Sequence, residues 1–402
     1  MATKANKKNS VYLYGTTDAD FLTNSGSSVT IVSYSGNDTI NNSGSSAKIF
    51  AGDGNNYVSL IGSGGSGTSV ISGDGNDTLD VKSSSSSRYS NLINAGGGKN
   101  YLNNNNVMQS TITAGDDDDT IISGGYYSKI DAGDGANKIY VGNSYYNHHN
   151  TITSGKGSDL ISVSGDSYQN SITAGNGNNT IYGGTDKNST VTAGSGDDKV
   201  TVGGSAYVNV GDGKNNISIS SGASSTIISG KGNDTINFNS SKDSRYSNLI
   251  NAGGGKNYIN NSNIMQSTIT AGTGNDTIIS GGYYSKIDAG AGANKIYVGD
   301  SYYNHHNTIT SGKGSDLISV SSDSYSNSII AGNGNNTVYG GLGTNNTVTA
   351  GKGNDKVTVG GSAYVNVGNG RNNISISSGA SSMIISGSGN DTINVNSSTD
   401  SR

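Results

Sequence analysis

The sequence predicts an all-β protein: a parallel β-solenoid (β-roll or β-helix-like) of about 20 coils with roughly 19 residues in each coil. Two observations carry this prediction. Residues 88–244 recur almost residue for residue as residues 245–401. Within both copies, and in the segment before them, a turn of the form A/S-G-x-G-N-D/N followed by Thr-Ile-like pairs returns roughly every 17 to 23 residues, from Asp53 to Asp391. A period of this length accommodates two short strands and two turns, which is one coil of a solenoid.

The composition agrees with stacked coils and not with a globular domain. The chain has 63 Gly and no Pro, Cys or Trp, and all its acids are Asp. A composition this rich in Gly, Ser and Asn usually indicates disorder. Here, however, each coil brings Ile, Val, Leu or Ala at matched positions. A single coil could not bury that apolar face, but stacked neighbours can.

Charge and residue usage exclude several classes of protein. The net charge of −5 disfavours nucleic acid and anionic membranes as partners. The absence of Cys excludes disulfides and thiol chemistry. No apolar run is long enough to span a bilayer, so we expect no membrane insertion. Met1–Ser10 is basic but no apolar stretch follows it, so it does not read as a cleaved signal peptide.

The chain is expected to form one continuous rod with four segments. These are a flexible N-terminal tail (1–10), N-terminal solenoid coils (11–87), a first long repeat (88–244) and a second long repeat (245–401), each long repeat with about eight coils.

Residues 271–288 illustrate a single coil. Gly272 and Gly274 can adopt the positive φ that a tight turn needs. Thr277–Ser280 is rich in β-branched residues and predicts a strand. Gly281 and Gly282 mark a second turn, and Ser285–Asp288 begins the return strand. This second turn varies in length along the chain, and such insertions often gather on an interaction face.

The sixth position of the constant turn alternates between Asn and Asp. The series runs Asn56, Asp77, Asn100, Asp119, Asn137, Asp159, Asn179, Asp198, Asn215, Asp234, Asn257, Asp276, Asn294, Asp316, Asn336, Asp355, Asn372, Asp391. Successive members would lie about 4.8 Å apart on one edge. The alternation therefore predicts that the structural unit is a pair of coils.

These turns resemble the RTX, or haemolysin-type calcium-binding, repeat family, whose consensus is Gly-Gly-x-Gly-x-Asp-x-apolar-x. Close matches are SGDGNDTLD (72–80), SGKGNDTIN (229–237), AGTGNDTII (271–279) and SGSGNDTIN (386–394), and the resemblance covers nearly the whole chain from Ser33 onward. One turn per long coil is similar to the solenoids of large RTX surface adhesins. In that family, Asp side chains and turn carbonyls hold Ca²⁺ between neighbouring turns. The resemblance thus implies these metal ligands: Asp38, Asp77, Asp119, Asp159, Asp198, Asp234, Asp276, Asp316, Asp355 and Asp391.

Two hypotheses for this edge remain open. Half of the family's Asp positions are Asn here, and Ca²⁺ takes most of its affinity from carboxylates. An Asp–Asn pair with backbone carbonyls could still hold the ion, and the extra acids in Asp116–Asp119 favour this. Alternatively, Asn separates the Asp charges and forms amide hydrogen bonds, so that no metal is needed. The loss of Asp134 and Asp212 from the second copy, where Ala291 and Asn369 stand, favours this second hypothesis.

The variable edge carries aromatic residues. A glycan or a neighbouring rod could bind a stacked Tyr strip, or the rings could merely pack over the turns below. The candidates are Tyr126, Tyr127, Tyr145, Tyr146, Tyr168, Tyr283, Tyr284, Tyr302, Tyr303 and Tyr325. All four His lie in two pairs, His148–His149 and His305–His306. One long repeat separates the pairs, so they cannot share an ion, and each is either a local metal site or an exposed loop.

An enzyme is disfavoured because every feature between residues 88 and 401 occurs twice, whereas catalysis needs one convergent cluster. We therefore predict a structural repeat protein: a rod, stalk or matrix fibre, with Ca²⁺ stiffening under the first hypothesis. The alternatives are an adhesive module that uses the Tyr/Asn-rich edge, and an ice-binding solenoid of RTX type. Ice binding is disfavoured because it would need a rank of Thr along the turns, and the third turn position has Thr only at Thr273.

The predicted location is extracellular or on the cell surface, reached without a cleaved N-terminal signal peptide. The chain stops at Arg402, at a repeat boundary, which would leave a sheet edge open. We therefore expect either that the chain is part of a longer protein or that it self-associates end-to-end or side-by-side.

Overall fold

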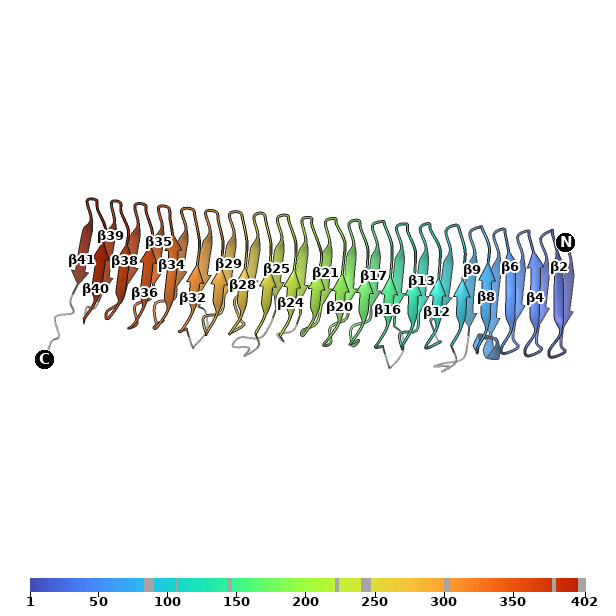
Figure 1. Cartoon of the computed structure of the whole chain (residues 1–402). Helices are drawn as coiled ribbons and strands as arrows, with labels where there is room; N and C mark the ends of the chain where they lie inside the picture. The colour runs from blue at the N-terminus through green and yellow to red at the C-terminus, as the bar shows by residue number, and fades with distance from the viewer. Residues whose placement is uncertain are drawn as a thin grey trace. The chain divides into compact units, whose positions relative to one another are not determined.

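The structure is a computed structural model of the whole chain that describes residues 1–82, 90–105, 107–142, 147–220, 224–239, 247–299, 304–377 and 381–396. The chain forms two compact units, Met1–Gly203 and Gly204–Arg402. Each unit is a parallel β-solenoid, and the predicted fold class is confirmed (Figure 1). The predicted boundaries of the long repeats, near residues 88 and 245, fall outside the described residues.

In the first unit, odd-numbered strands form one sheet and even-numbered strands form the other. The odd strands are β1 Thr3–Asn6, β3 Phe21–Asn24, β5 Thr39–Asn42, β7 Tyr57–Ile61, β9 Thr78–Lys82, β11 Tyr101–Asn104, β13 Thr120–Ser123, β15 Lys138–Val141, β17 Leu160–Val163, β19 Thr180–Gly183 and β21 Lys199–Val202. The even strands are β2 Tyr12–Thr16, β4 Thr30–Tyr34, β6 Lys48–Gly52, β8 Ser69–Ser72, β10 Leu92–Asn94, β12 Thr111–Thr113, β14 Lys129–Asp131, β16 Thr151–Thr153, β18 Ser171–Thr173 and β20 Thr190–Thr192. A 3₁₀ turn, η1 Gly62–Gly65, lies between β7 and β8.

The second unit has the same arrangement. Its odd strands are β23 Asn216–Ile219, β25 Thr235–Phe238, β27 Tyr258–Asn261, β29 Thr277–Ser280, β31 Lys295–Val298, β33 Leu317–Val320, β35 Thr337–Gly340, β37 Lys356–Val359, β39 Asn373–Ser377 and β41 Thr392–Asn396. Its even strands are β22 Tyr207–Asn209, β24 Thr226–Ile228, β26 Leu249–Asn251, β28 Thr268–Thr270, β30 Lys286–Asp288, β32 Thr308–Thr310, β34 Ser328–Gly332, β36 Thr347–Ala350, β38 Tyr364–Val367 and β40 Met383–Ser386.

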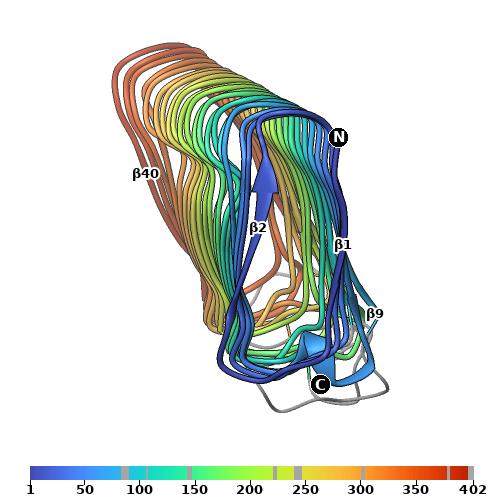
Figure 2. The ribbon, with the colours of Figure 1, turned by 90° about the vertical axis from the view of Figure 1, so that its right-hand side faces the viewer.

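The core of each unit is a stack of equivalent apolar side chains. In the first unit Ile121 pairs with Ile139, which is followed in register by Ile161 and Ile181, all fully buried. Strand side chains alternate between the two faces of a sheet, so the flanking Thr and Lys residues point outward. Each buried Ile contributes about 1.5–3 kcal/mol of transfer free energy. Figure 2 shows the coils of this unit lying one behind another.

The constant turns permit close stacking because they contain glycine. Gly272 has φ 93°, and a Cβ on it would lie 1.5 Å from the carbonyl oxygen of Gly253 in the preceding coil. Gly274 has φ 133°, with a Cβ position 2.0 Å from the Gly255 carbonyl oxygen. Both glycines adopt the positive φ predicted for them. A larger residue would force neighbouring coils apart.

Three local features refine the prediction. The strand expected at Thr277–Ser280 is β29, with those bounds, whereas the return strand β30 starts at Lys286 and leaves Ser285 as a buried turn residue. Thr3–Asn6, expected within a flexible tail, instead forms β1 and pairs in parallel with Phe21–Asn24 of β3. Its backbone hydrogen bonds to β3 hold this segment in place. No helix among the described residues is long and apolar enough to cross a membrane.

Candidate functional site

The alternating Asn and Asp residues of the constant turn form a continuous column within each unit, which we call the Asx column. Its side chains are buried except for the partly exposed Asp391; Asp77 and Asn100, for example, expose 1% and 3% of their surface. The backbone N–H of Asn56 donates to Oδ1 of Asp77 at 2.7 Å, and the N–H of Asp77 donates to Oδ1 of Asn100 at 2.9 Å. Each side chain therefore reaches back to the backbone of the preceding coil.

The second unit repeats this geometry. The N–H of Asn257 donates to Oδ1 of Asp276 at 2.7 Å, and the N–H of Asp276 donates to Oδ1 of Asn294 at 3.0 Å. The N–H of Asn294 in turn donates to Oδ1 of Asp316 at 2.8 Å. Asn and Asp are thus equivalent at one side-chain atom, and they differ only at the other.

In the coils that carry Asn in the Asx column, the second side-chain atom is Nδ2, which donates hydrogen bonds to backbone carbonyls. Nδ2 of Asn137 donates to the carbonyls of Gly133 and Gly135 in its own turn, at 3.1 and 3.3 Å. Nδ2 of Asn100 donates to the Gly98 carbonyl at 2.8 Å. The amide group therefore donates to the same carbonyl oxygens of the turn that a bound cation would have to contact.

In the Asp coils, the equivalent atom is an acceptor, and most of these acceptors have no donor. Oδ2 is buried without a hydrogen-bond partner in Asp38, Asp77, Asp119, Asp234, Asp276 and Asp355. Two members find a hydroxyl donor: Ser154 donates to Oδ2 of Asp159 at 2.7 Å, and Ser311 donates to Oδ2 of Asp316 at 2.9 Å. A buried carboxylate oxygen without a donor is costly while it is charged.

Burial consequently raises the pKa of these carboxyl groups. It raises the pKa of Asp119 to about 7, and the pKa values of Asp77, Asp198 and Asp276 to about 6. Burial also raises the pKa above its ordinary value in Asp38, Asp159, Asp234, Asp316 and Asp355. Among the ten predicted Asp residues, the direction reverses at Asp391, near the end of the second unit. There the Asn372 backbone N–H lowers the pKa of the partly exposed Asp391.

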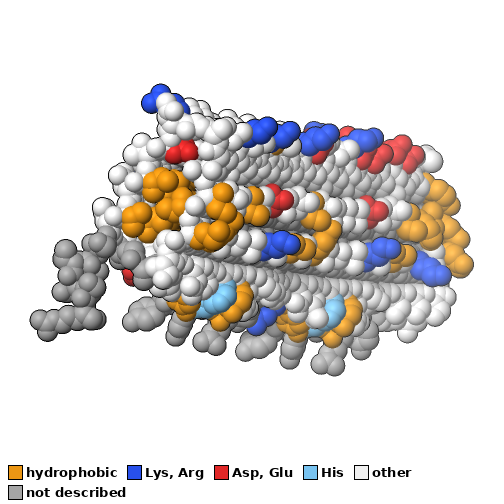
Figure 3. Space-filling view, turned by 60° about the vertical axis from the view of Figure 1, so that its left-hand side comes forward, with side chains coloured by type: hydrophobic (Ala, Val, Ile, Leu, Met, Phe, Trp, Pro, Cys, Tyr) orange, Lys and Arg blue, Asp and Glu red, His pale blue; other side chains and the backbone are white. Residues whose placement is uncertain are grey.

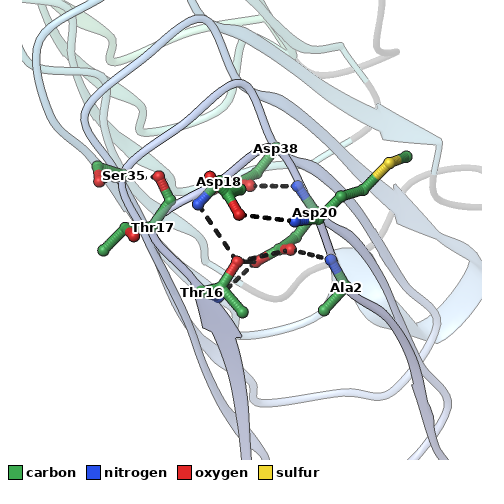
Figure 4. Close-up of polar contacts among 8 residues, drawn as sticks. Ala2, Thr16, Thr17, Asp18, Asp20, Ser35 and Asp38 are labelled. Atoms are coloured by element: carbon green, nitrogen blue, oxygen red, sulfur yellow. Dashed lines mark hydrogen bonds and ion pairs between the residues drawn. The ribbon is translucent and has the colours of Figure 1, made fainter.

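The structure thus brings all ten predicted acids to the Asx column, and it adds one that sequence reasoning missed. Asp20 occupies the sixth position of the first turn, and its N–H donates to Oδ1 of Asp38 at 2.8 Å (Figure 4). Its carboxylate accepts hydrogen bonds from the backbone N–H groups of Ala2 and Thr16 and from the Thr16 hydroxyl. Burial raises the pKa of Asp20, but these donors outweigh it and the pKa lies below its ordinary value. The 18-residue spacing between Asp20 and Asp38, which equals one coil, could have predicted that Asp20 belongs to the same series.

The Asx column in this arrangement does not fit Ca²⁺. Ca²⁺ takes 6–8 oxygen ligands, with carboxylates supplying charge. Each Asp offers at most one uncommitted oxygen, because Oδ1 already accepts a backbone N–H, and in Asp159 and Asp316 a Ser hydroxyl also donates to Oδ2. The neighbouring coils present an Asn amide. Among the described residues, no group of three or more His, Cys, Asp or Glu gathers as a metal site. The ligand role of the ten Asp residues therefore remains a prediction, and binding would require the turns to rearrange.

A second column, not anticipated from the sequence, lines the opposite edge. The N–H of Ser128 donates to Oδ1 of Asn150 at 3.0 Å, and the N–H of Asn150 donates to Oδ1 of Asn170 at 3.0 Å. In the second unit, Asn307 and Asn327 continue a similar series. The sequence feature that could have revealed this column is the Ser or Asn that directly precedes each return strand, as in the segments SKID and NTIT. This column holds the variable turns in register.

The described members of the aromatic strip lie on this second edge. Tyr126 and Tyr127 precede β14, and Tyr168 precedes β18, with His148 between them in the intervening coil. The equivalent Tyr283, Tyr284 and Tyr325 lie in the second unit with His305. Figure 3 shows each His pair beside hydrophobic side chains at the molecular surface. Tyr145, Tyr146, Tyr302 and Tyr303 lie outside the described residues.

Comparisons with known proteins agree with the turn geometry. The family model of the RTX calcium-binding nonapeptide repeat (4 copies) matches residues 111–144, 162–189, 184–206, 210–244, 268–301, 320–346 and 341–363. No curated protein matches the chain.

Among solved structures, the chain is similar to the crystal structure of a TibC-catalysed hyper-glycosylated TibA fragment. The identity is 14% over 99% of this chain and 98% of that chain, with a TM-score of 0.15. This likeness is too weak to support an argument. The repeat match, together with the parallel solenoid, shows that the chain carries RTX calcium-binding nonapeptide repeats.

Proposed function

We propose that this repeat protein acts as a rod, stalk or matrix fibre outside the cell or on its surface. One observation carries the proposal: in each unit, hydrogen-bonded side-chain columns line both edges of two parallel sheets. Every coil is therefore joined to the next through two strands and two side-chain contacts. Such a quasi-one-dimensional stack changes its length by adding coils and keeps its chemistry unchanged.

Mechanical and scattering measurements test this proposal. Small-angle X-ray scattering of the full chain should give a constant cross-section along an elongated particle, and single-molecule pulling should give repeated unfolding steps of coil groups. A compact, roughly spherical particle would contradict the proposal. Labelling of intact cells with an antibody to the chain tests the surface location separately, and staining only after lysis would count against it.

Ca²⁺ stiffening is the alternative assembly route. The family match and the six buried Oδ2 atoms without a donor support it, because a cation is one way to satisfy those oxygens. Under this alternative, the chain gains structure on export to a calcium-rich medium, since binding energy becomes folding energy. The hydrogen-bonded Asx column supports the opposite outcome, in which the coils form in chelator.

Self-association is proposed at the end of the second unit. The inward-facing Ile393 and Val395 of β41 are 47% and 55% exposed, whereas the equivalent Ile374 and Ile376 of β39 are fully buried. Another coil stacked on β41 would cover them, whether it came from a second copy or from further chain. Analytical ultracentrifugation of the full chain should show concentration-dependent association, which the double variant Ile393→Lys/Val395→Lys should abolish.

Ice binding is a second candidate function, favoured by a feature away from the turns. On the outer face of the even-numbered sheet, Thr151 aligns with Ser171 and Thr190, and Thr153 aligns with Thr173 and Thr192. This places hydroxyl and methyl groups on a regular grid with about 4.8 Å between strands. Lys129 and Asp131 on β14 interrupt the same face. A measurement of thermal hysteresis decides the matter, and zero hysteresis at high protein concentration removes this candidate.

A further inference from the structure

Three consecutive coils of the first unit bring five rings together on the second edge. Tyr126, His148 and Tyr168 are joined by parallel backbone bridges. The His148 ring stacks on Tyr168 at 4.4 Å between centroids, and the Tyr127 ring stacks on His149 at 4.7 Å with an interplanar angle of 2°. Tyr126 meets His148 edge-on at 4.9 Å. We call these five residues the first His–Tyr cluster.

The backbone arranges these rings at some conformational cost. Tyr127, His149 and Gln169 occupy equivalent positions in successive coils, and all three have left-handed φ values of 49°, 59° and 54°. Non-glycine residues adopt this region only when the surroundings hold them there, at about 1–3 kcal/mol each. The left-handed residue turns its side chain back beside that of its predecessor. As a result, the two adjacent His rings lie close together in an edge-on arrangement, with 69° between the ring planes.

The second unit builds the same cluster from its own residues. His305 stacks on Tyr325 at 4.5 Å, and Tyr284 stacks on His306 at 4.9 Å with an interplanar angle of 6°. His306 has a left-handed φ of 57°. The rings of each His pair lie 4.7 Å apart in both units. The arrangement therefore follows from the repeat sequence and occurs once in each unit.

The decisive contact lies between the two imidazoles of each pair. Nδ1 of His148 is 2.5 Å from Nδ1 of His149, and Nδ1 of His305 is 2.5 Å from Nδ1 of His306. Two nitrogen lone pairs repel at this separation unless a positive centre, a proton or a metal ion, lies between or against them. A metal ion with bonds of about 2.0–2.1 Å to each nitrogen and an angle of about 90° between them would hold the nitrogens about 2.8–3.0 Å apart, so the two rings would have to separate by a few tenths of an ångström to admit it.

We infer that each His pair, walled by its stacked Tyr rings, is a chelating site for a divalent transition-metal cation, with Cu²⁺ bound most tightly. Imidazole nitrogen suits Cu²⁺, Ni²⁺ and Zn²⁺, and affinity at a nitrogen site follows the Irving–Williams order, which peaks at Cu²⁺. Water would complete the coordination sphere, because no third His, Cys or acid joins either pair within the described ranges. This site is chemically distinct from the oxygen ligands of the Asx column.

The electrostatic surroundings favour metal over two protons. Burial lowers the pKa of His148, and the neighbouring His149 lowers it further; the same two causes act on His305. The lowered pKa favours the neutral imidazole of His148 and of His305, which has a lone pair available to a metal. The stacked Tyr faces also restrict ring rotation, so little conformational freedom is lost on binding.

The test is a Cu²⁺ titration of the full chain followed by Tyr fluorescence, since the chain has 24 Tyr and no Trp. Cu²⁺ bound at the His pairs should quench the stacked Tyr rings and saturate at two equivalents per chain. Electron paramagnetic resonance should show hyperfine coupling to nitrogen ligands. A thousandfold excess of Ca²⁺ should leave the titration unchanged, since Ca²⁺ prefers oxygen ligands.

Variants assign the ions to the His pairs. His149→Asn and His306→Asn each introduce Asn, which tolerates a left-handed φ. Each variant should reduce the bound Cu²⁺ by one equivalent per chain. The double variant should remove both. Gln169→Asn is the matched control, because it makes an equivalent change at the equivalent backbone position one coil away, and it should keep both equivalents. Far-UV circular dichroism verifies that each variant is folded. Absent quenching, an absence of nitrogen hyperfine coupling, or full binding by a folded double variant would overturn the inference.

Discussion

The backbone N–H of Asn100 donates to Oδ1 of Asp119 in the next coil at 2.7 Å, while Nδ2 of Asn100 donates to carbonyls of its own turn and of the following coil. This relationship explains why Asn and Asp alternate. Two ionised carboxylates about 4.8 Å apart would repel by about 3.5 kcal/mol at an effective dielectric constant of 20, and alternation halves that figure by doubling the distance. The intervening Asn contributes the donor that Asp lacks.

Stability should fall as pH rises from about 4 to about 7. The buried Asp residues have folded-state pKa values raised to about 6 or 7, above the unfolded value near 3.9. A raised carboxyl pKa means that the folded state binds more protons, so this contribution is full at low pH and lost as the groups ionise. Thermal denaturation at pH 5 and pH 8 should therefore give the higher Tm at pH 5. A Tm that rises with pH across this range would contradict the assignment.

Asp119→Asn should stabilise the protein at pH 8 by about 2–4 kcal/mol, because it replaces a buried charge with an amide that can donate to the turn carbonyls. The gain should shrink at pH 5, where the carboxyl group is already protonated. Asp118→Asn is the matched control: this neighbour is exposed, pairs with Lys99 at 2.6 Å and should leave the free energy of unfolding nearly unchanged. Urea denaturation measures both variants, and equal effects would show that burial is not the cause.

Asn100→Asp makes the reverse change at an Asn coil. It places a third carboxylate between Asp77 and Asp119 and removes the Nδ2 donor, so we expect a loss of about 3–5 kcal/mol at pH 8. Much of the lost stability should be recovered at pH 5, where the carboxyl groups are protonated. A variant equally stable at both pH values would mean that charge along the Asx column does not govern folding.

Gly272→Ala should destabilise the second unit by about 3 kcal/mol or more, because its Cβ would meet the Gly253 carbonyl and its φ is 93°. Gly165→Ala serves as the comparison. Its Cβ position is 3.9 Å from the nearest atom, and its φ lies outside the left-handed region, so we expect a change within about 0.5 kcal/mol. Similar losses for the two variants would argue against close stacking of the turns.

Removal of calcium should leave the fold intact, since the Asx column is already linked by hydrogen bonds. Circular dichroism and Tm should be the same in excess chelator and in millimolar Ca²⁺. A cooperative gain of β structure with added Ca²⁺ would instead assign the Asp oxygens to metal and support the stiffening alternative.

Much of this architecture was predictable from local pattern. The 17-to-23-residue period, the positive-φ glycines and the strand Thr277–Ser280 follow from turn chemistry and side-chain alternation, which act within one coil. The place of Asp20 in the Asx column and the pairing of Thr3–Asn6 with the first coils were not predicted. Their partners lie about 18 residues away and become visible only when the coils are stacked in register.

The sequence by itself determined the coil, the repeat and the ten Asp residues of the constant edge, because these depend on spacing along the chain. Only the tertiary structure decided what those residues do. Whether Asp119 faces solvent, a metal or a neighbouring N–H depends on the coils above and below, and these bury it and raise its pKa. The adjacency of His148 and His149 was evident in sequence. Their facing Nδ1 atoms were not, since a left-handed φ at His149 and the rings of two neighbouring coils set that contact.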